Sequence, residues 1–174
     1  MQRRGARLTL LLPILLAAGY LAMEYWAPAQ PSRGARPSSV IAGAARVIDG
    51  DTIEIDRQRF RLHGIDAPEM SQTCQRSGAA YRCGEDAATQ LRSLLGSRIT
   101  QCTTHARDAY GRHLAVCRSA GQDVGEMMVR NGWAIAFRRY SSDYVSAEND
   151  ARSRRAGLWA GAFDPPSDWR RQRP

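Results

Sequence analysis

Three short polar segments carry the residue types that cleavage of a phosphate ester would need. Asp49-Gly50-Asp51-Thr52 places two carboxylates in a turn, Arg61–Glu69 combines an arginine with two carboxylates, and Asp108–Arg112 is a turn from which an arginine leaves. Carboxylate oxygens suit a hard cation, a further carboxylate can accept a proton from water, and guanidinium groups can contact phosphoryl oxygens. Each segment alone is typical of a turn, but together they favour phosphodiester hydrolysis.

A run of predicted strands and helices must position these segments. Alternation of apolar and polar residues predicts five strands, at residues 46–48, 52–55, 58–65, 99–105 and 113–118. Apolar residues at helical spacing predict three helices, at residues 84–95, 124–131 and 144–156. Three strands, a helix, two strands and further helices are typical of a mainly β fold, a five-stranded Greek-key barrel with appended helices.

The three segments, in this order, resemble the staphylococcal nuclease (thermonuclease) family, in which V-I-D-G-D-T is followed by R-L-x-G-I-D-A-P-E and by D-x-Y-G-R. Two later segments, Asn131–Ala134 and Ala151–Trp159, are also similar to the family, and the resemblance covers about residues 43 to 171. It implies an OB-fold barrel, in agreement with the strand pattern. It further implies a monomeric, calcium-dependent nuclease that cuts the 5′ phosphoester bond of DNA and RNA, leaves 3′-phosphates and favours single-stranded or frayed substrates.

The resemblance also assigns a role to each matching residue of the calcium and phosphate sites. Asp51 and Asp66 match the calcium-binding carboxylates, and Ala67 contributes its backbone carbonyl. Arg61 and Arg112 match the two arginines that bind the scissile phosphate. Planar guanidinium groups suit this task because each can contact two phosphoryl oxygens.

The remaining assignments concern the attacking water and the substrate. Glu69 matches the carboxylate beside that water, either as general base or as the group that positions the water. Tyr110 matches a tyrosine that contacts a neighbouring phosphate, and Tyr140 is the first candidate for stacking on a base, with Phe137 and Tyr144 as alternatives. The alternative function is a catalytically inactive OB-fold module that binds nucleic acid or a protein partner. It is disfavoured because all five matching carboxylates and arginines are present.

Four cysteines without metal-finger spacing predict two disulfides. If the hairpin loop comprises the four residues 108–111, Cys102 lies directly opposite Cys117 on the neighbouring strand, near bridging range. The remaining two cysteines, Cys74 and Cys83, are then predicted to form the second disulfide. The family's founding member lacks these cysteines, so the chain resembles a disulfide-bearing, exported branch.

The charge balance points to a polyanionic partner. The 174-residue chain has a net charge of +8, and all 25 of its basic residues are arginines. Residues 30–174 alone retain 22 arginines against 16 acidic residues, so the bias belongs to the domain. The composition excludes collagen-like, coiled-coil and polytopic membrane proteins.

The amino terminus has the pattern of an export segment, which we assign to residues 1–29. Three arginines precede an apolar run from Leu8 to Met23, and Leu8–Trp26 is of borderline length for a membrane span. A cleaved signal would leave the domain periplasmic or extracellular, and an uncleaved anchor would tether it through residues 8–26 to the outside of the cytoplasmic membrane. We assign residues 30–42 to a linker, 43–171 to the nuclease domain and 172–174 to a tail.

Overall fold

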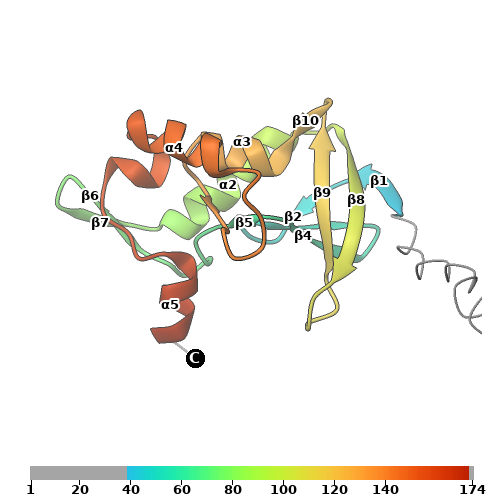
Figure 1. Ribbon diagram of the computed structural model, residues 1–174, viewed down its shortest axis with the longest axis horizontal. Helices are drawn as coiled ribbons and strands as arrows, with labels where there is room; N and C mark the ends of the chain where they lie inside the picture. The colour runs from blue at the N-terminus through green and yellow to red at the C-terminus, as the bar shows by residue number, and fades with distance from the viewer. Residues whose placement is uncertain (1–38, 173–174) are drawn as a thin grey trace, which may run out of the picture. The chain divides into compact units, whose positions relative to one another are not determined.

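The computed structural model describes residues 39–172 (Figure 1). The predicted export segment, most of the predicted linker and the last two residues of the tail lie outside the described residues. Within residues 39–172, no helix is both long and apolar enough to cross a membrane.

The centre of the fold is a curled sheet. Its strands are β1 (Val40–Ala44), β2 (Arg46–Val47), β3 (Thr52–Ile55), β4 (Gln58–Leu62), β8 (Ile99–Arg107), β9 (His113–Ser119) and β10 (Gln122–Asp123). They lie in the order β1-β8-β9-β4-β3-β2, with β10 paired to β9, and β4 and β9 form the parallel pair of this sheet. The predicted mainly β class is confirmed. Strand β1 was missed, because its first three residues fall in the predicted linker.

Five helical segments follow or cover the sheet, namely α2 (Cys83–Leu95), α3 (Val124–Arg130), α4 (Val145–Ser153), the 3₁₀ turn η1 (Gly157–Ala160) and α5 (Pro166–Gln172). The three predicted helices are present. Helix α4 ends three residues early, and Arg155 two residues later has φ +52°, which no α-helix accommodates. Helix α5 was not predicted. The described strands and helices run from Val40 to Gln172, and the domain limits 43–171 stay a prediction.

The single strand predicted over 58–65 is wrong, because the chain turns at Gly64. This glycine has φ +77°, so β4 ends at Leu62 and a separate short strand β5 (Ile65–Asp66) begins. Strand β5 pairs antiparallel with β11 (Ile135–Ala136) instead of continuing in the main sheet. Asp66 is thereby carried away from the sheet while Arg61 remains within it.

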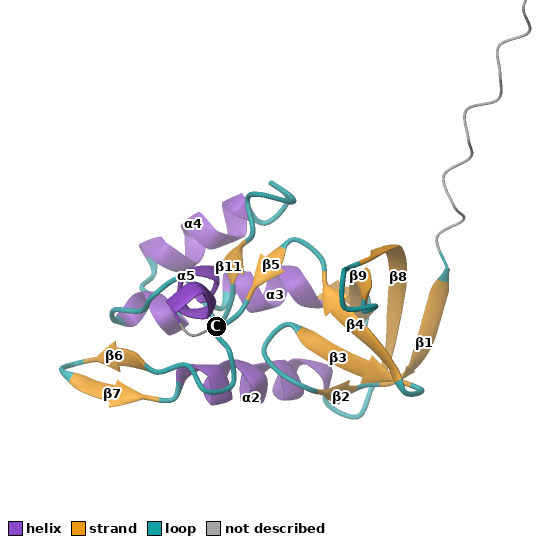
Figure 2. Ribbon diagram, turned by 90° about the horizontal axis from the view of Figure 1, so that it is seen from below, coloured by secondary structure: helices purple, strands orange, loops and turns teal. Residues whose placement is uncertain are grey.

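The core lies between the sheet and helices α2 and α3, which lie against it in both views (Figures 1 and 2). Ile53 and Phe60 from the sheet are fully buried, as are Leu91 from α2 and Met128 from α3. Asp123 caps α3 as its capping-box spacing predicts, since its side chain accepts the Glu126 N–H at 3.1 Å. The core elements therefore provide a fixed frame for the segments that carry polar residues.

Both predicted disulfides are present. Cys102 and Cys117 lie directly opposite on β8 and β9, with their Cα atoms 4.0 Å apart. The loop is one residue longer than expected, since the Asp108 N–H donates to the Arg112 carbonyl, but a bulge in β8 between Thr104 and Ala106 restores the register. The predicted four-residue loop was therefore wrong, and the predicted Cys102–Cys117 disulfide is confirmed.

The second disulfide closes the base of a short hairpin that was not predicted from the sequence. Cys74 in β6 (Cys74–Arg76) is bonded to Cys83 at the start of α2, and β6 pairs with β7 (Ala79–Tyr81). This hairpin projects from the end of the molecule remote from β1 (Figures 1 and 2). It lies between the turn that carries Glu69 and helix α2.

Candidate active site

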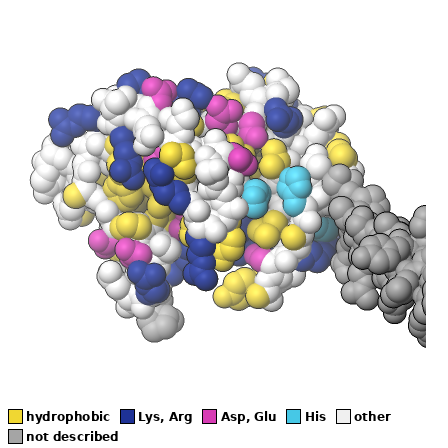
Figure 3. All heavy atoms as spheres, viewed as in Figure 1, with side chains coloured by type: hydrophobic (Ala, Val, Ile, Leu, Met, Phe, Trp, Pro, Cys, Tyr) yellow, Lys and Arg dark blue, Asp and Glu magenta, His cyan; other side chains and the backbone are white. Residues whose placement is uncertain are grey.

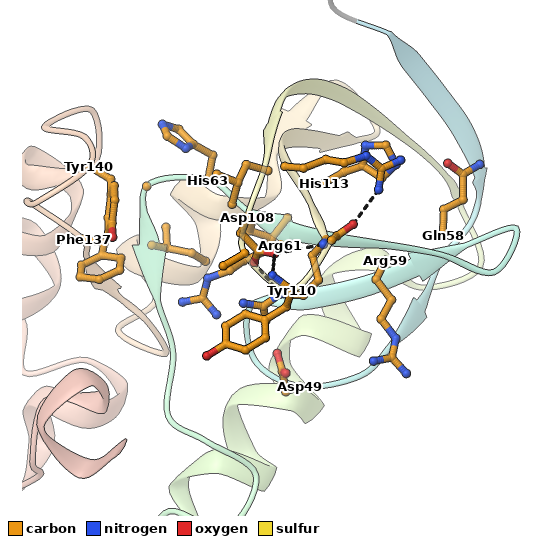
Figure 4. A pocket seen from close by; sticks show the side chains of 18 of the residues that line it. Asp49, Gln58, Arg59, Arg61, His63, Asp108, Tyr110, His113, Phe137 and Tyr140 are labelled. Carbon is orange, nitrogen blue, oxygen red and sulfur yellow. Dashed lines mark hydrogen bonds and ion pairs between the residues drawn. The ribbon is translucent and has the colours of Figure 1, made fainter. Parts of the chain in front are cut away.

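The polar segments meet at one cleft of about 1060 Å³. Its walls are strand β4, the loop of the β8–β9 hairpin, the segment around Phe137 and Tyr140, and Arg170 from α5. Figure 4 shows Tyr110 and Arg61 projecting near one another, while Phe137 and Tyr140 come from a separate segment.

The guanidinium of Arg61, which lines this cleft, joins two buried carboxylates that lie beneath the cleft lining. Its Nη1 donates to Asp51 Oδ1 at 2.7 Å and its Nη2 donates to Asp66 Oδ1 at 2.8 Å. Both carboxylates are buried, and the Arg61 side chain is only 14% exposed. One planar group therefore bonds to both carboxylates, and we call Asp51, Arg61 and Asp66 the floor of the cleft.

Backbone contacts fix the floor residues in place. Asp51 lies directly before β3, its carbonyl accepts the Leu62 N–H at 2.8 Å, and its N–H donates to Asp49 Oδ1 at 3.0 Å. Its second carboxylate oxygen accepts the Ala67 N–H at 3.1 Å. Asp51 is thus tied both to the strand that carries Arg61 and to the residue after Asp66.

Burial dominates the electrostatics of the two carboxylates. It raises the pKa of Asp51 to about 7, although the Arg61 guanidinium acts in the opposite direction, and the neighbouring charges of Asp49 and Asp66 raise the pKa further. Burial also raises the pKa of Asp66, against Arg170 and Arg61, which lower it. Burial therefore disfavours the ionised form of both carboxylates, and the neighbouring arginines favour it.

Glu69 lies beside the floor on a tight turn. The Gln72 N–H donates to the Glu69 carbonyl at 2.8 Å, and Gln72 Oε1 accepts the Glu69 N–H at 3.3 Å. Helix α2 begins against this turn, where a Cβ on Gly84 would lie 1.7 Å from the Glu69 carbonyl oxygen. Only glycine fits there, so the first turn of α2 sets the position of Glu69.

Arg112 lines the same cleft but contacts none of the floor carboxylates. Its Nε donates to Asp108 Oδ2 at 2.7 Å, and its backbone N–H donates to Asp108 Oδ1 at 3.0 Å. Its guanidinium lies 5.4 Å from the centre of the Tyr110 ring, and that ring is 85% exposed. Asp108 thus orients the loop arginine, a role that sequence reasoning missed.

The structure separates the candidates for base stacking. Tyr140 is exposed at the cleft and packs edge-on against Phe137, with ring centres 4.8 Å apart. Tyr144 is buried and its hydroxyl lies 3.2 Å from both carboxylate oxygens of Asp123. Tyr144 is therefore a packing residue and is removed from the stacking candidates.

Sequence reasoning also missed Arg170. This arginine on α5 donates from Nη1 to Glu69 at 2.7 Å and from Nη2 to both oxygens of Asp66 at 3.0 and 3.1 Å. No local signal marks it, because it is one of two adjacent arginines near the end of the chain. Within residues 39–172, no cluster of three or more His, Cys, Asp or Glu side chains could hold a metal ion.

Comparison of the sequence with known protein families identifies one that it matches. Residues 59–161 match the family described as "Staphylococcal nuclease homologue". The chain belongs to the staphylococcal nuclease family. The resemblance inferred from the motifs is thereby confirmed. The matched range includes Arg61, Asp66, Glu69 and Arg112, whereas Asp51 and Arg170 lie outside it.

Two bacterial relatives match this chain over most of its length. The chain is 43% identical over 123 residues to the succinoglycan biosynthesis protein ExoI of Rhizobium meliloti, which covers 68% of this chain and 64% of ExoI. It is 36% identical over 136 residues to an uncharacterized endonuclease of Escherichia coli O157:H7, covering 74% of this chain and 83% of that protein.

A plant relative matches over a similar length. The chain is 30% identical over 124 residues to the probable staphylococcal-like nuclease CAN2 of Oryza sativa, covering 70% of this chain and 31% of that protein. The chain thus spans less than two thirds of ExoI and about a third of the rice protein. The nuclease and endonuclease names of the relatives support the predicted hydrolase activity.

Proposed function

We propose that this protein is a calcium-dependent nuclease that hydrolyses phosphodiester bonds of DNA and RNA and leaves 3′-phosphates. One observation carries the proposal: Arg61, which lines the cleft together with Glu69 and Arg112, is bonded to both buried carboxylates, Asp51 and Asp66. Membership of the staphylococcal nuclease family supports nucleic acid as the substrate.

The chemistry of the two floor carboxylates fits calcium. They offer oxygen donors only, and hard cations such as Ca²⁺ prefer oxygen. Asp51 and Asp66, with the backbone carbonyl of Ala67, would hold the ion, which when bound supplies positive charge to polarise a phosphoryl oxygen.

The other residues act on water and phosphate. Glu69, partly exposed in the cleft, accepts a proton from the attacking water or positions that water. The water oxygen forms a new bond to phosphorus while the bond to the 5′ oxygen breaks. The 5′ oxygen leaves as a hydroxyl after accepting a proton from solvent water. Arg61 and Arg112 contact the phosphoryl oxygens and stabilise the charge that develops on them.

Exposed aromatic rings at the cleft favour a single-stranded or frayed substrate. Tyr110 contacts a neighbouring phosphate, and the Tyr140 ring is available for an unpaired base. Arginine side chains are spread over the face of Figure 3 among acidic ones, which fits loose attraction to a polyanion more than a single charged groove.

The test of the proposed chemistry is Glu69→Gln, which removes the proton acceptor and keeps the shape. We expect turnover of a fluorescent single-stranded DNA with Ca²⁺ to fall by ~10²–10⁴ while DNA binding is retained. The control is Glu85→Gln on the exposed surface of α2, which should keep full activity. Wild-type turnover in Glu69→Gln would remove Glu69 from the mechanism.

A second measurement tests the ion and the products. A chelator should abolish turnover, and added Ca²⁺ should restore it. Treatment of the products with a 3′-phosphatase should release inorganic phosphate. Full turnover in excess chelator, or products with 5′-phosphates, would overturn the corresponding part of the proposal.

We also propose that the domain is exported. The basic and apolar pattern of residues 1–29 and the two disulfides support this, because disulfides persist in oxidising compartments. Fractionation with a carboxy-terminal tag should place the domain beyond the cytoplasmic membrane, either soluble or with membranes. A cytosolic domain that retains residues 1–29 would contradict export.

A further inference from the structure

Helix α5 brings a third arginine into the site, far along the chain from the nuclease motifs. Arg170 bridges Asp66 and Glu69, which precede it by 104 and 101 residues. Its guanidinium therefore joins one carboxylate assigned to calcium to the carboxylate assigned to the attacking water. It lies outside the range that matches the family.

Hydrogen bonds to the segment before α5 hold this helix beside Asp66 and Glu69. Gln72, which is fully buried, accepts the Glu69 N–H through Oε1 and donates from Nε2 to the Asp164 carbonyl at 2.8 Å. Gln75 and Ala162 exchange two backbone hydrogen bonds, at 2.8 and 2.9 Å. Figure 1 shows α5 beside the segment that leads to the β6–β7 hairpin.

Three further features anchor the carboxy-terminal segment. Pro166 and Trp169 of α5 are buried. A Cβ on Gly161 would lie 1.9 Å from the Gln75 carbonyl oxygen, so the backbones meet too closely for a larger residue. The Cys74–Cys83 disulfide fastens the strand that receives this segment. These contacts hold α5 beside the site, and so keep Arg170 within reach of the two carboxylates.

The hydrogen bonds of Asp66 leave little room for another cation. Its two oxygens accept one bond from Arg61 and two from Arg170, out of about four acceptor positions on a carboxylate. Arg61 is buried within the floor, whereas the Arg170 side chain is 37% exposed at the mouth of the cleft. Of these two arginines, Arg170 is the one that can withdraw without disturbing the floor.

We propose that Arg170 is a built-in competitor of the metal ion, bound to Asp66 and Glu69 until the ion displaces it. The inference rests on the proposed calcium-dependent function and adds a residue that sets how tightly the ion binds. Its physical basis is that two cations compete for the same buried carboxylate, so removing one raises the affinity for the other.

The test measures Ca²⁺ binding by calorimetry, at fixed ionic strength and without nucleic acid. Arg170→Met keeps the aliphatic stem and removes the charge, and we expect it to bind Ca²⁺ roughly tenfold more tightly than the wild type. The matched control is Arg171→Met, which removes the same charge from the next residue. Arg171 is 76% exposed and pairs with Asp168 on its own helix, so Ca²⁺ affinity should stay nearly unchanged.

A second variant keeps the test decisive if Arg170→Met does not fold. Arg170→Lys retains the charge, but a single ammonium cannot reproduce the forked contact with both carboxylates, so its Ca²⁺ affinity should lie between those of the wild type and Arg170→Met. Unfolding curves will show which variants are native.

The outcomes separate this inference from the proposed function. Ca²⁺ binding of equal or lower affinity in the native Arg170 variants overturns the competition and leaves the calcium proposal standing. If neither the wild type nor any variant binds Ca²⁺, both proposals fail.

Discussion

The floor of the cleft and the β8–β9 hairpin loop present the two arginines assigned to the phosphate in opposite ways. Arg61 is buried and tied to Asp51, which directly precedes β3, and to Asp66 in β5. Arg112 is held by Asp108 within its own five-residue loop, beside a Tyr110 ring that is almost fully exposed. The floor is therefore a product of tertiary packing, whereas the loop is largely organised by its own hydrogen bonds.

This difference predicts different costs for the same chemical change. Removing a partner from a buried ion pair leaves an uncompensated charge and destabilises the protein. Ion pairs nearer the surface are screened by water and contribute little to stability. Changes in the floor should therefore lower both stability and activity, and changes in the loop should lower activity alone.

Among the changes that compare the floor with the loop, the largest effects are expected from Arg61→Lys and Arg112→Lys. A lysine cannot bridge two acceptors with a planar fork, so each variant should lose ~10²–10³ in kcat. Arg61→Lys should also lower the melting temperature clearly, whereas Arg112→Lys should leave it nearly unchanged. Turnover assays and thermal melts check this, and equal melting temperatures for both variants would break the proposed contrast.

A smaller effect is expected from removing one disulfide at a time by paired cysteine-to-alanine changes. Loss of Cys102–Cys117 should cost roughly 3 kcal/mol of unfolding free energy, and loss of Cys74–Cys83 roughly 2.5 kcal/mol, because it closes the shorter loop. Urea unfolding measures both. The first change loosens the base of the hairpin loop, and the second loosens the segment after Glu69. A larger loss for the 74–83 pair would contradict the loop-length argument.

The smallest effect is expected from Asp108→Asn, which keeps the shape of the turn and removes its charge. Arg112 is then held less firmly, so kcat/KM should fall roughly fivefold, equivalent to about 1 kcal/mol, with the melting temperature unchanged. Asp150→Asn, which alters an exposed pair with Arg130, is the matched control. A loss as large as that of Arg112→Lys would mean that Asp108 itself acts on the substrate.

The sequence alone predicted the parts of the site that lie in continuous motifs. Asp51, Arg61, Asp66, Glu69 and Arg112 fall at turns and strand ends that alternation and turn residues reveal. The structure brings the first four of these into one connected set and places Arg112 across the same cleft. Their catalytic roles stay predictions, while the fold class and the family are confirmed.

The parts that sequence reasoning missed depend on contacts between distant residues. The break of the strand at Gly64 and the bulge in β8 are adjustments to neighbouring strands, so periodicity could not place them. Nothing in the sequence around Tyr144 indicates that its hydroxyl bonds to Asp123, which lies 21 residues earlier.

Local patterns determined which residues could do chemistry, because strands, turns and helix caps depend on neighbours within a few positions. Only the tertiary structure decided which arginine meets which carboxylate. Arg170 and Arg171 are identical in type and adjacent in sequence, yet one enters the site and the other lies in solvent. What separates them is the direction in which α5 packs, which depends on Gln72 and Gln75 about a hundred residues earlier.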